Sequence, residues 1–237
     1  GLIMNHIPPF TFEEYKNMIL EAHNYLLSLG ITSATDPAAN EELLAAYIQL
    51  DKEGLLKVRM NVFPLRIPDG SDEIQPLPEK YESDFLQIKT VKFFADGGLS
   101  SATAAMNVPY KNTDGYTGVL RLDYHRFFQT AKEAVEKGFS VATHAIGHQA
   151  VDLTLKVYRE LFEINTTLKH RIEHLGFLST QNIHDFKQMN MTAAMQPIFI
   201  YELANNFKNT LSDDLLEVVH PCKTVLENGI NLALSTD

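Results

Sequence analysis

Four side chains able to bind a metal ion lie at or near the ends of four segments that resemble β-strands. Lys92 lies in IKTVKFFADG, His144 ends FSVATH, His174 ends RIEH and Asp237 ends NLALSTD. Histidine nitrogens and carboxylate oxygens suit zinc, manganese or iron. A lysine joins such a set when CO2 carboxylates its amine, because the product is an anionic oxygen ligand that can bridge two metals. A metal lowers the pKa of its bound water towards about 7, and a carboxylate can then move the water proton to a leaving group.

Each of these residues also has a purely structural explanation when it is taken alone. Lys92 could face solvent or form an ion pair inside a barrel, and a single buried histidine is more often a hydrogen-bonded core residue. Asp237 alone is only a polar residue at the end of a strand. Their recurrence on successive strands is what favours one shared site.

Five other histidines receive no functional role from the sequence. By the helical period, His23, His125 and His184 lie on helix surfaces, His170 lies at a strand entrance, and His220 with Pro221 is a loop residue.

The elements that must position these side chains alternate along the chain. The spacing of apolar residues predicts helices over 12–29, 40–52, 124–137, 149–163, 180–189 and 213–228. Apolar and β-branched runs predict strands over 31–36, 56–63, 88–95, 139–144, 171–175, 191–197 and 231–234, the last of them buried. Pro37 and Pro64 are expected to end the first two strands. Residues 67–84 are predicted to form a loop, and residues 99–122 are predicted to form a functional loop. Within the second loop, Tyr110, Tyr116 and Leu120 are candidates for a pocket wall. Phe199 and Tyr201, which follow the strand over 191–197, are further candidates.

Alternating strands and helices predict an α/β fold with a parallel sheet, because parallel neighbours need a crossover connection. A doubly wound open sheet and a (β/α)8 barrel are the two possible closures. The open sheet usually carries a glycine-rich phosphate turn after its first strand, and no such motif occurs here. A barrel places its chemistry at the C-terminal ends of several strands. The distribution of Lys92, His144, His174 and Asp237 therefore favours the TIM-type barrel.

Composition narrows the class of protein. The chain has 237 residues, 45% of them hydrophobic and 21% charged, which is enough apolar material for one large domain or two small ones. Its formal charge of −10 argues against a general nucleic-acid binder. No apolar run approaches the roughly 18 residues of a membrane span. Cys222 is the single cysteine, which excludes a disulfide framework and favours a reducing cytoplasm.

Several of these segments together resemble the amidohydrolase superfamily, and most of all its branch called amidohydrolase family 3, the YtcJ-like metal-dependent hydrolases. They are VKFFADGG with LSSATAAM after it, THAIGHQAV, HRIEH and LALSTD, while GITSATD is similar to the family's second-strand signature. The resemblance implies a distorted (β/α)8 barrel joined to a small β-sandwich. It implies that Lys92, His144 and His174 are the metal ligands of strands four, five and six. It also implies that Asp237 is the strand-eight ligand and the general base.

Asp96 and Gly97 correspond by this resemblance to residues that line the family's site. His148 stands in HAIGH where the family commonly has Asp, so these three are the candidate substrate-binding residues. The family's first strand carries an H-x-H pair of metal ligands, and no such pair occurs in this chain. We expect that strand to precede Gly1 and the β-sandwich to lie outside the chain. Residues 1–237 are then a partial barrel with strands two to eight.

The resulting expectation is a hydrolase acting on carbon–nitrogen bonds other than peptide bonds. It would cleave an amide or formamide bond of a small molecule through a metal-bound hydroxide. The expected cofactor is a divalent metal, zinc above all, as one or two ions with a carboxylated Lys92. The expected partner is the small-molecule substrate, with neither nucleic acid nor membrane, and a homodimer is compatible with such a barrel.

Two other functions remain open from the residues. Lys92 could be a Schiff-base nucleophile, as in barrel aldolases, although this leaves His144, His174 and Asp237 without a common purpose. A non-catalytic, ligand-binding barrel is the other alternative, and His148 and the missing H-x-H pair favour it.

Overall fold

The computed structural model describes residues 8–237, so the first seven residues of the predicted domain lie outside the described part. The chain divides into two compact units. The first comprises residues 8–65 and 77–90, and the second comprises Arg66–Pro76 and Val91–Asp237. Each unit has its own sheet.

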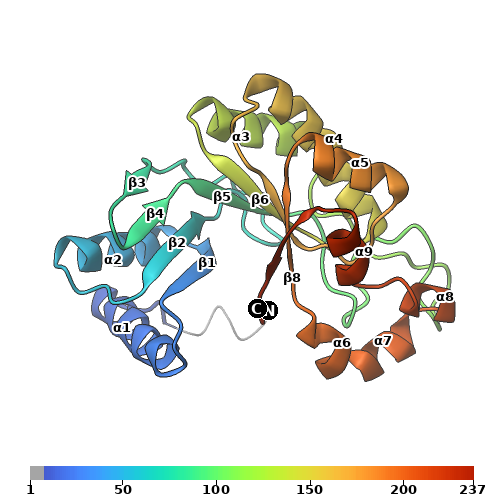
Figure 1. The fold of residues 1–237 in the computed structure, drawn as a ribbon, viewed down its shortest axis with the longest axis horizontal. Helices are drawn as coiled ribbons and strands as arrows, with labels where there is room; N and C mark the ends of the chain where they lie inside the picture. The colour runs from blue at the N-terminus through green and yellow to red at the C-terminus, as the bar shows by residue number, and fades with distance from the viewer. Residues whose placement is uncertain (1–7) are drawn as a thin grey trace. The chain divides into compact units, whose positions relative to one another are not determined.

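The first unit contains a four-stranded sheet in the order β1-β2-β4-β3. β1 (Ser33–Ala39), β2 (Arg59–Pro64) and β4 (Leu86–Ile88) run parallel, while β3 (Tyr81–Glu82) is antiparallel to β4. α2 (Glu41–Lys52) packs on the three parallel strands, and α1 (Phe12–Ser28) packs on α2 (Figure 1). α1 begins with a capping box between Thr11 and Glu14, and the Asn40 side chain caps α2. The side chains of Thr11 and Asn40 accept hydrogen bonds from backbone N–H groups of the first helical turn, which have no partner within the helix.

Three expectations fail in this unit. Pro37 does not end its strand, since β1 continues to Ala39 through a register shift between Asp36 and Ala39. Pro64 ends β2 as predicted, whereas residues 67–84, predicted as a loop, contain the short strand β3. Proline has no N–H group to donate to the strand ladder, so it is tolerated at a register shift or at the end of a strand, where no regular hydrogen bond is lost. His23, expected on a helix surface, is buried, and its Nδ1 accepts a hydrogen bond from Lys57 N at 3.3 Å.

The second unit contains a five-stranded sheet in the order β5-β6-β7-β8-β9. Its strands are β5 (Thr90–Phe94), β6 (Ser140–Ala145), β7 (Arg171–His174), β8 (Thr192–Met195) and β9 (Asn231–Leu234), with parallel pairing from β6 to β9. The connections are α3 (Tyr124–Glu136), α4 (His148–Ile164) and α5 (Thr180–Gln188), and Figure 1 shows these three helices in a row along the sheet. Consecutive strands are therefore neighbours, so their C-terminal ends meet at one edge.

After β8 the chain is more helical than the sequence predicts. α6 (Ile198–Glu202) and α7 (Ala204–Thr210) precede α8 (Asp213–Leu216) and α9 (Cys222–Glu227). The sequence predicts no element for residues 198–210. β9 forms where a strand is predicted but is largely exposed, with Leu234 at 64% exposure, because it pairs only with β8 at the end of this sheet.

The predicted α/β class with parallel sheets is confirmed. Within residues 8–237, no helix has both the length and the apolar character needed to cross a membrane.

Candidate functional site

All the predicted site residues belong to the second unit: Lys92, Asp96, Gly97, His144, His148, His174 and Asp237. Among them, His144 and His174 are brought together by the pairing of β6 with β7, in which Ala145 lies opposite His174. The centroids of the two imidazole rings are 4.6 Å apart in an edge-to-face arrangement. Burial lowers the pKa of His144 to about 3 and lowers that of His174, so both rings are neutral, which is the form that binds a metal.

Each of these rings has one nitrogen held by an acceptor. His144 Nε2 lies 3.0 Å from the Gly97 carbonyl oxygen, and His174 Nδ1 lies 2.8 Å from Gln196 Oε1. An oxygen of either kind can only accept, so the ring nitrogen facing it donates. The other nitrogen of each ring then carries the lone pair. Gln196 was not predicted from the sequence.

Lys92 on β5 is buried, with 3% of its surface exposed. Its Nζ lies 5.0 Å from the centre of the Phe94 ring. Burial lowers the pKa of Lys92 to about 8, against the opposite pull of the Glu173 carboxylate. A lysine in this state is neutral more often than an exposed one, and the neutral amine is the form that reacts with CO2 or with a carbonyl.

Glu173 is a second buried residue that the sequence reasoning missed. It is 5% exposed, and its Oε2 accepts a hydrogen bond of 2.8 Å from Arg171 Nη2, with a second one to Oε1 from Arg171 Nε. It also interacts electrostatically with Lys92. The available signal was an acidic residue inside the short strand RIEH, where an unpaired charge would be costly.

Asp237 follows β9 and is exposed, with a left-handed backbone (φ 79°). It interacts electrostatically with both Lys92 and His174, and its charge opposes the lowering of their pKa values by burial. Asp237 thus interacts electrostatically with two of the other three predicted ligands.

Asp96 and Gly97 form the turn after β5. Asp96 is fully buried and accepts three main-chain hydrogen bonds, from Ala105 N (2.9 Å), Ile146 N (3.1 Å) and Gly147 N (2.8 Å). Burial raises the pKa of Asp96 to about 7, although these three donors favour the carboxylate. Its Oδ1 is also 3.6 Å from His144 Nε2.

His148 is the first residue of α4, on the segment that follows β6. Its ring stacks on Phe177 at a centroid distance of 4.2 Å, and burial lowers its pKa. No hydrogen-bond partner for its buried Nδ1 exists in the described part of the chain. His148 therefore lies against the loops that follow the strands rather than on a strand end.

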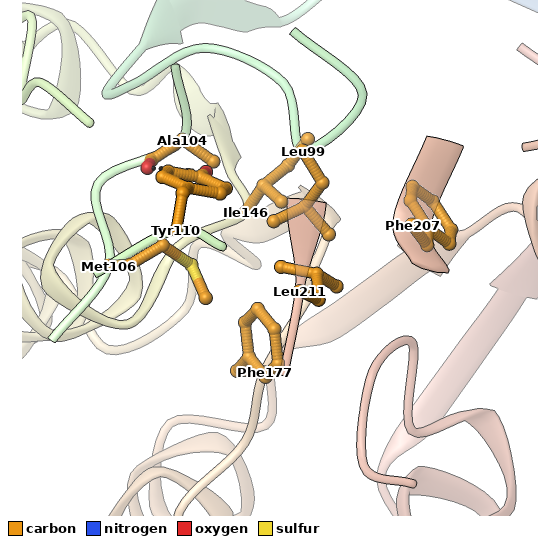
Figure 2. Packing of buried hydrophobic residues seen from close by; sticks show 8 residues of the cluster. All are labelled: Leu99, Ala104, Met106, Tyr110, Ile146, Phe177, Phe207 and Leu211. Atoms are coloured by element: carbon orange, nitrogen blue, oxygen red, sulfur yellow. Dashed lines mark hydrogen bonds between the residues drawn. The ribbon is translucent and has the colours of Figure 1, made fainter. Parts of the chain in front are cut away.

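The segments that follow β5 to β8 pack together in an apolar cluster, which we call the loop cluster. Its buried members are Leu99, Ala104, Met106, Tyr110, Ile146, Phe177, Phe207 and Leu211 (Figure 2). Tyr110, a candidate for the pocket wall, is a buried member whose hydroxyl donates to Ala104 O at 2.8 Å. Tyr116 and Leu120 remain partly exposed, at 42% and 36%.

An aromatic row connects the loop cluster with His174. Phe199 on α6 packs against the cluster and stacks on His174 at 6.0 Å, whereas Tyr201 is 80% exposed. His220 packs on Phe199 and Phe207, at 5.8 and 5.6 Å, and forms a hydrogen bond with the backbone of His174. His220 is buried, so its interpretation as a simple loop residue is incomplete.

The donor chemistry of these residues fits a divalent metal. Two neutral imidazoles lie side by side with one nitrogen of each held by an acceptor, and a carboxylate interacts with one of them. Within residues 8–237, however, no three His, Cys, Asp or Glu side chains converge closely enough to hold a metal ion by themselves.

The chain is similar to a solved structure described as a metal-dependent hydrolase and to two curated proteins. A crystal structure of an uncharacterised metal-dependent hydrolase from Pyrococcus furiosus is similar with a TM-score of 0.84 and 27% identity, covering 99% of this chain and 48% of that chain. Protein LONG AFTER FAR-RED 3 of Arabidopsis thaliana is 24% identical over 250 residues, which cover 100% of this chain and 43% of that protein. YtcJ of Bacillus subtilis strain 168 is 28% identical over 162 residues, which cover 67% of this chain and 30% of that protein.

The chain thus spans less than half the length of these relatives, which is consistent with an incomplete barrel. A model of the amidohydrolase family matches residues 1–237. Since this match extends over the whole sequence, the chain belongs to the amidohydrolase family.

Proposed function

We propose that the protein containing this chain is a metal-dependent hydrolase that cleaves a C–N bond, of amide or formamide type, in a small molecule. The observation that carries the proposal is the neighbouring pair His144 and His174, whose ring centroids are 4.6 Å apart. Lys92 interacts electrostatically with both rings, and Asp237 interacts electrostatically with His174. Membership of the amidohydrolase family supports the reaction class.

Lys92, His144, His174 and Asp237 would hold the metal, which we propose to be zinc, as one or two ions. When bound, a divalent metal polarises a carbonyl group and lowers the pKa of a coordinated water. Lys92 would take part as a carbamate, formed when its neutral amine adds to CO2 and loses a proton. Asp237 would accept the proton of the attacking water and return it to the leaving nitrogen as the C–N bond breaks.

The metal content of the intact protein tests the proposal, measured by inductively coupled plasma mass spectrometry after reconstitution with zinc and bicarbonate. We expect one or two zinc ions per protein chain, and loss of zinc in Lys92→Ala and His174→Ala. His184→Ala is the matched control, because His184 is exposed on α5 and should leave the zinc content unchanged. A wild-type protein that takes up no metal would contradict the proposal.

The role of Asp237 has a separate test. Asp237→Asn removes the proton acceptor but keeps the shape of the side chain, so kcat should fall by about 10²–10⁴-fold on an amide substrate found by screening. Unchanged turnover with an unchanged circular dichroism spectrum would exclude Asp237 as the general base.

A Schiff-base enzyme is the second candidate, favoured by the burial of Lys92 beside Phe94. Borohydride reduction in the presence of a carbonyl substrate would then label Lys92 covalently. Mass spectrometry of the digested protein distinguishes the two candidates, because the hydrolase should carry no such label.

A further inference from the structure

Gln196 connects His174 to the end of the neighbouring strand. It follows β8 and is only 2% exposed. Its Oε1 lies 2.8 Å from His174 Nδ1, and its Nε2 donates to Ser235 Oγ at 2.9 Å. In this arrangement the amide nitrogen donates to Ser235, and the amide oxygen faces the imidazole.

This arrangement determines which nitrogen of His174 carries hydrogen. A neutral imidazole has one N–H, and the amide oxygen can only accept a hydrogen bond. Nδ1 therefore carries the hydrogen and Nε2 carries the lone pair. His144 has the opposite arrangement, because its Nε2 donates to the Gly97 carbonyl at 3.0 Å and leaves the lone pair on Nδ1.

The backbone at His174 explains why such an external partner is needed. His174 and Leu175 have positive φ values of 75° and 43°, which non-glycine residues adopt only when surrounding contacts hold them. The short strand β7 ends at His174, so regular strand pairing does not continue beyond this residue. Gln196, the residue after β8, supplies a side-chain contact at the position where the backbone of β7 departs from extended geometry.

We propose that Gln196 is a positioning residue that holds His174 in the Nδ1–H tautomer and keeps its Nε2 available as a metal ligand. The metal part of this inference rests on the proposed function. An outer partner of this kind fixes the ring orientation of a metal-binding histidine, and its loss typically weakens metal binding about 10–100-fold.

The tautomer is measured first, in the metal-free intact protein labelled with 15N-histidine, by long-range 15N–1H NMR correlation at pH 7.5. We expect Nδ1–H for His174 and Nε2–H for His144. Gln196→Met removes the acceptor at similar size and should shift His174 towards the Nε2–H tautomer. Gln196→Glu should retain Nδ1–H, because a carboxylate oxygen accepts the same hydrogen bond and Ser235 Oγ can donate to the other oxygen.

The zinc dissociation constant is measured next, by competition with a chromophoric chelator. Gln196→Met should bind zinc about 10–100-fold more weakly than wild type, and Gln196→Glu should restore tight binding. Asn182→Leu is the matched control. Asn182 lies on α5, and its buried side-chain amide donates to Asp152 of α4 at 3.0 Å, so its loss should change neither measurement. If Gln196→Met does not fold, Ser235→Ala frees the Gln196 amide to turn and should produce a mixture of His174 tautomers.

The inference is overturned if wild-type His174 carries its hydrogen on Nε2, or if Gln196→Met retains both the tautomer and the zinc affinity of wild type. A wild-type protein that binds no zinc overturns the proposed function instead, and the tautomer measurement still decides the role of Gln196.

Discussion

Asp96 joins three stretches of the chain through one buried carboxylate. It begins the turn after β5 and accepts N–H groups from Ala105 in the following loop and from Ile146 and Gly147 ahead of α4. The adjacent Gly97 carbonyl faces His144. The ADGG sequence therefore holds the main chain around His144 in place. That Asp96 and Gly97 line the site remains a prediction.

Gly97 has no space for a side chain, and this yields a prediction. A Cβ at Gly97 would overlap the Oγ1 and Cβ atoms of Thr103. Gly97→Ala should therefore displace the carbonyl that holds His144 and reduce the free energy of unfolding by about 1–3 kcal/mol. Urea denaturation measures the effect. Gly98→Ala is the control, because a Cβ there meets its nearest neighbour, Ser101 Oγ, at an ordinary 3.4 Å. Equal stability of the two variants would contradict the prediction.

The sequence predicts some of these residues better than others. His144 and His174 could be identified because a polar residue at the end of an apolar strand stands out in a linear pattern. Glu173 was missed although an acidic residue inside the short strand RIEH was an available signal. Gln196 could not be identified, because its role depends on His174 of the neighbouring strand. His220 was missed for the same reason, since its contacts with Phe199 and Phe207 exist only in the folded chain.

Secondary-structure elements could be predicted where local pattern and packing agree. α3 and α4 have one apolar face and begin after a turn, so each of their ends lies within one residue of the predicted end. α6 and α7 have five and seven residues and no side-chain cap at their N-termini. They are held by the packing of Phe199 and Phe207 on the loop cluster, which a local pattern cannot show.

His170 connects β6 with β7 and makes stability depend on pH. It is buried beside Tyr158, its Nδ1 accepts a hydrogen bond from Val141 N at 3.0 Å, and burial lowers its pKa to about 4. Unfolded histidine binds a proton below about pH 6.5. Between these pH values the unfolded state holds more protons, so the free energy of unfolding should fall on acidification by up to about 1.4 kcal/mol per pH unit from this residue.

Urea denaturation at pH 7 and pH 5 checks this pH dependence. His170→Asn keeps an acceptor for Val141 N but cannot bind a proton, so its stability should fall less steeply with acid than that of wild type. His184→Asn, at an exposed position, should retain the wild-type slope. The same slope in His170→Asn as in wild type would exclude this origin.

At the scale of the whole molecule, the chain corresponds to only part of the length of its relatives. It spans less than half of its relatives and contains two units, of which the second holds every predicted ligand. The sequence predicts two further metal ligands outside this chain, as well as a cytoplasmic location and a homodimer, and all of these remain predictions.

Metal binding should stabilise the intact protein. Zinc that binds only the folded state at a free concentration of about 100 times its dissociation constant contributes about 2.7 kcal/mol. Differential scanning fluorimetry should therefore show a higher Tm when zinc is added to the metal-free protein. His144→Ala should lose this shift, whereas His125→Ala, at an exposed position of α3, should keep it. An identical shift in both variants would show that the zinc binds elsewhere.

The loop cluster has a consequence for the order of folding. Leu99 and Leu211 are separated by about 110 positions, and the members between them follow four different strands. Contacts of such long range form slowly, because the intervening chain must be closed before they contribute. β6 and β7, which bring His144 and His174 together, are consecutive and can pair earlier. We therefore expect β6 and β7 to bring His144 and His174 together before the loop cluster closes, so that a metal ion has access to the pair at that stage.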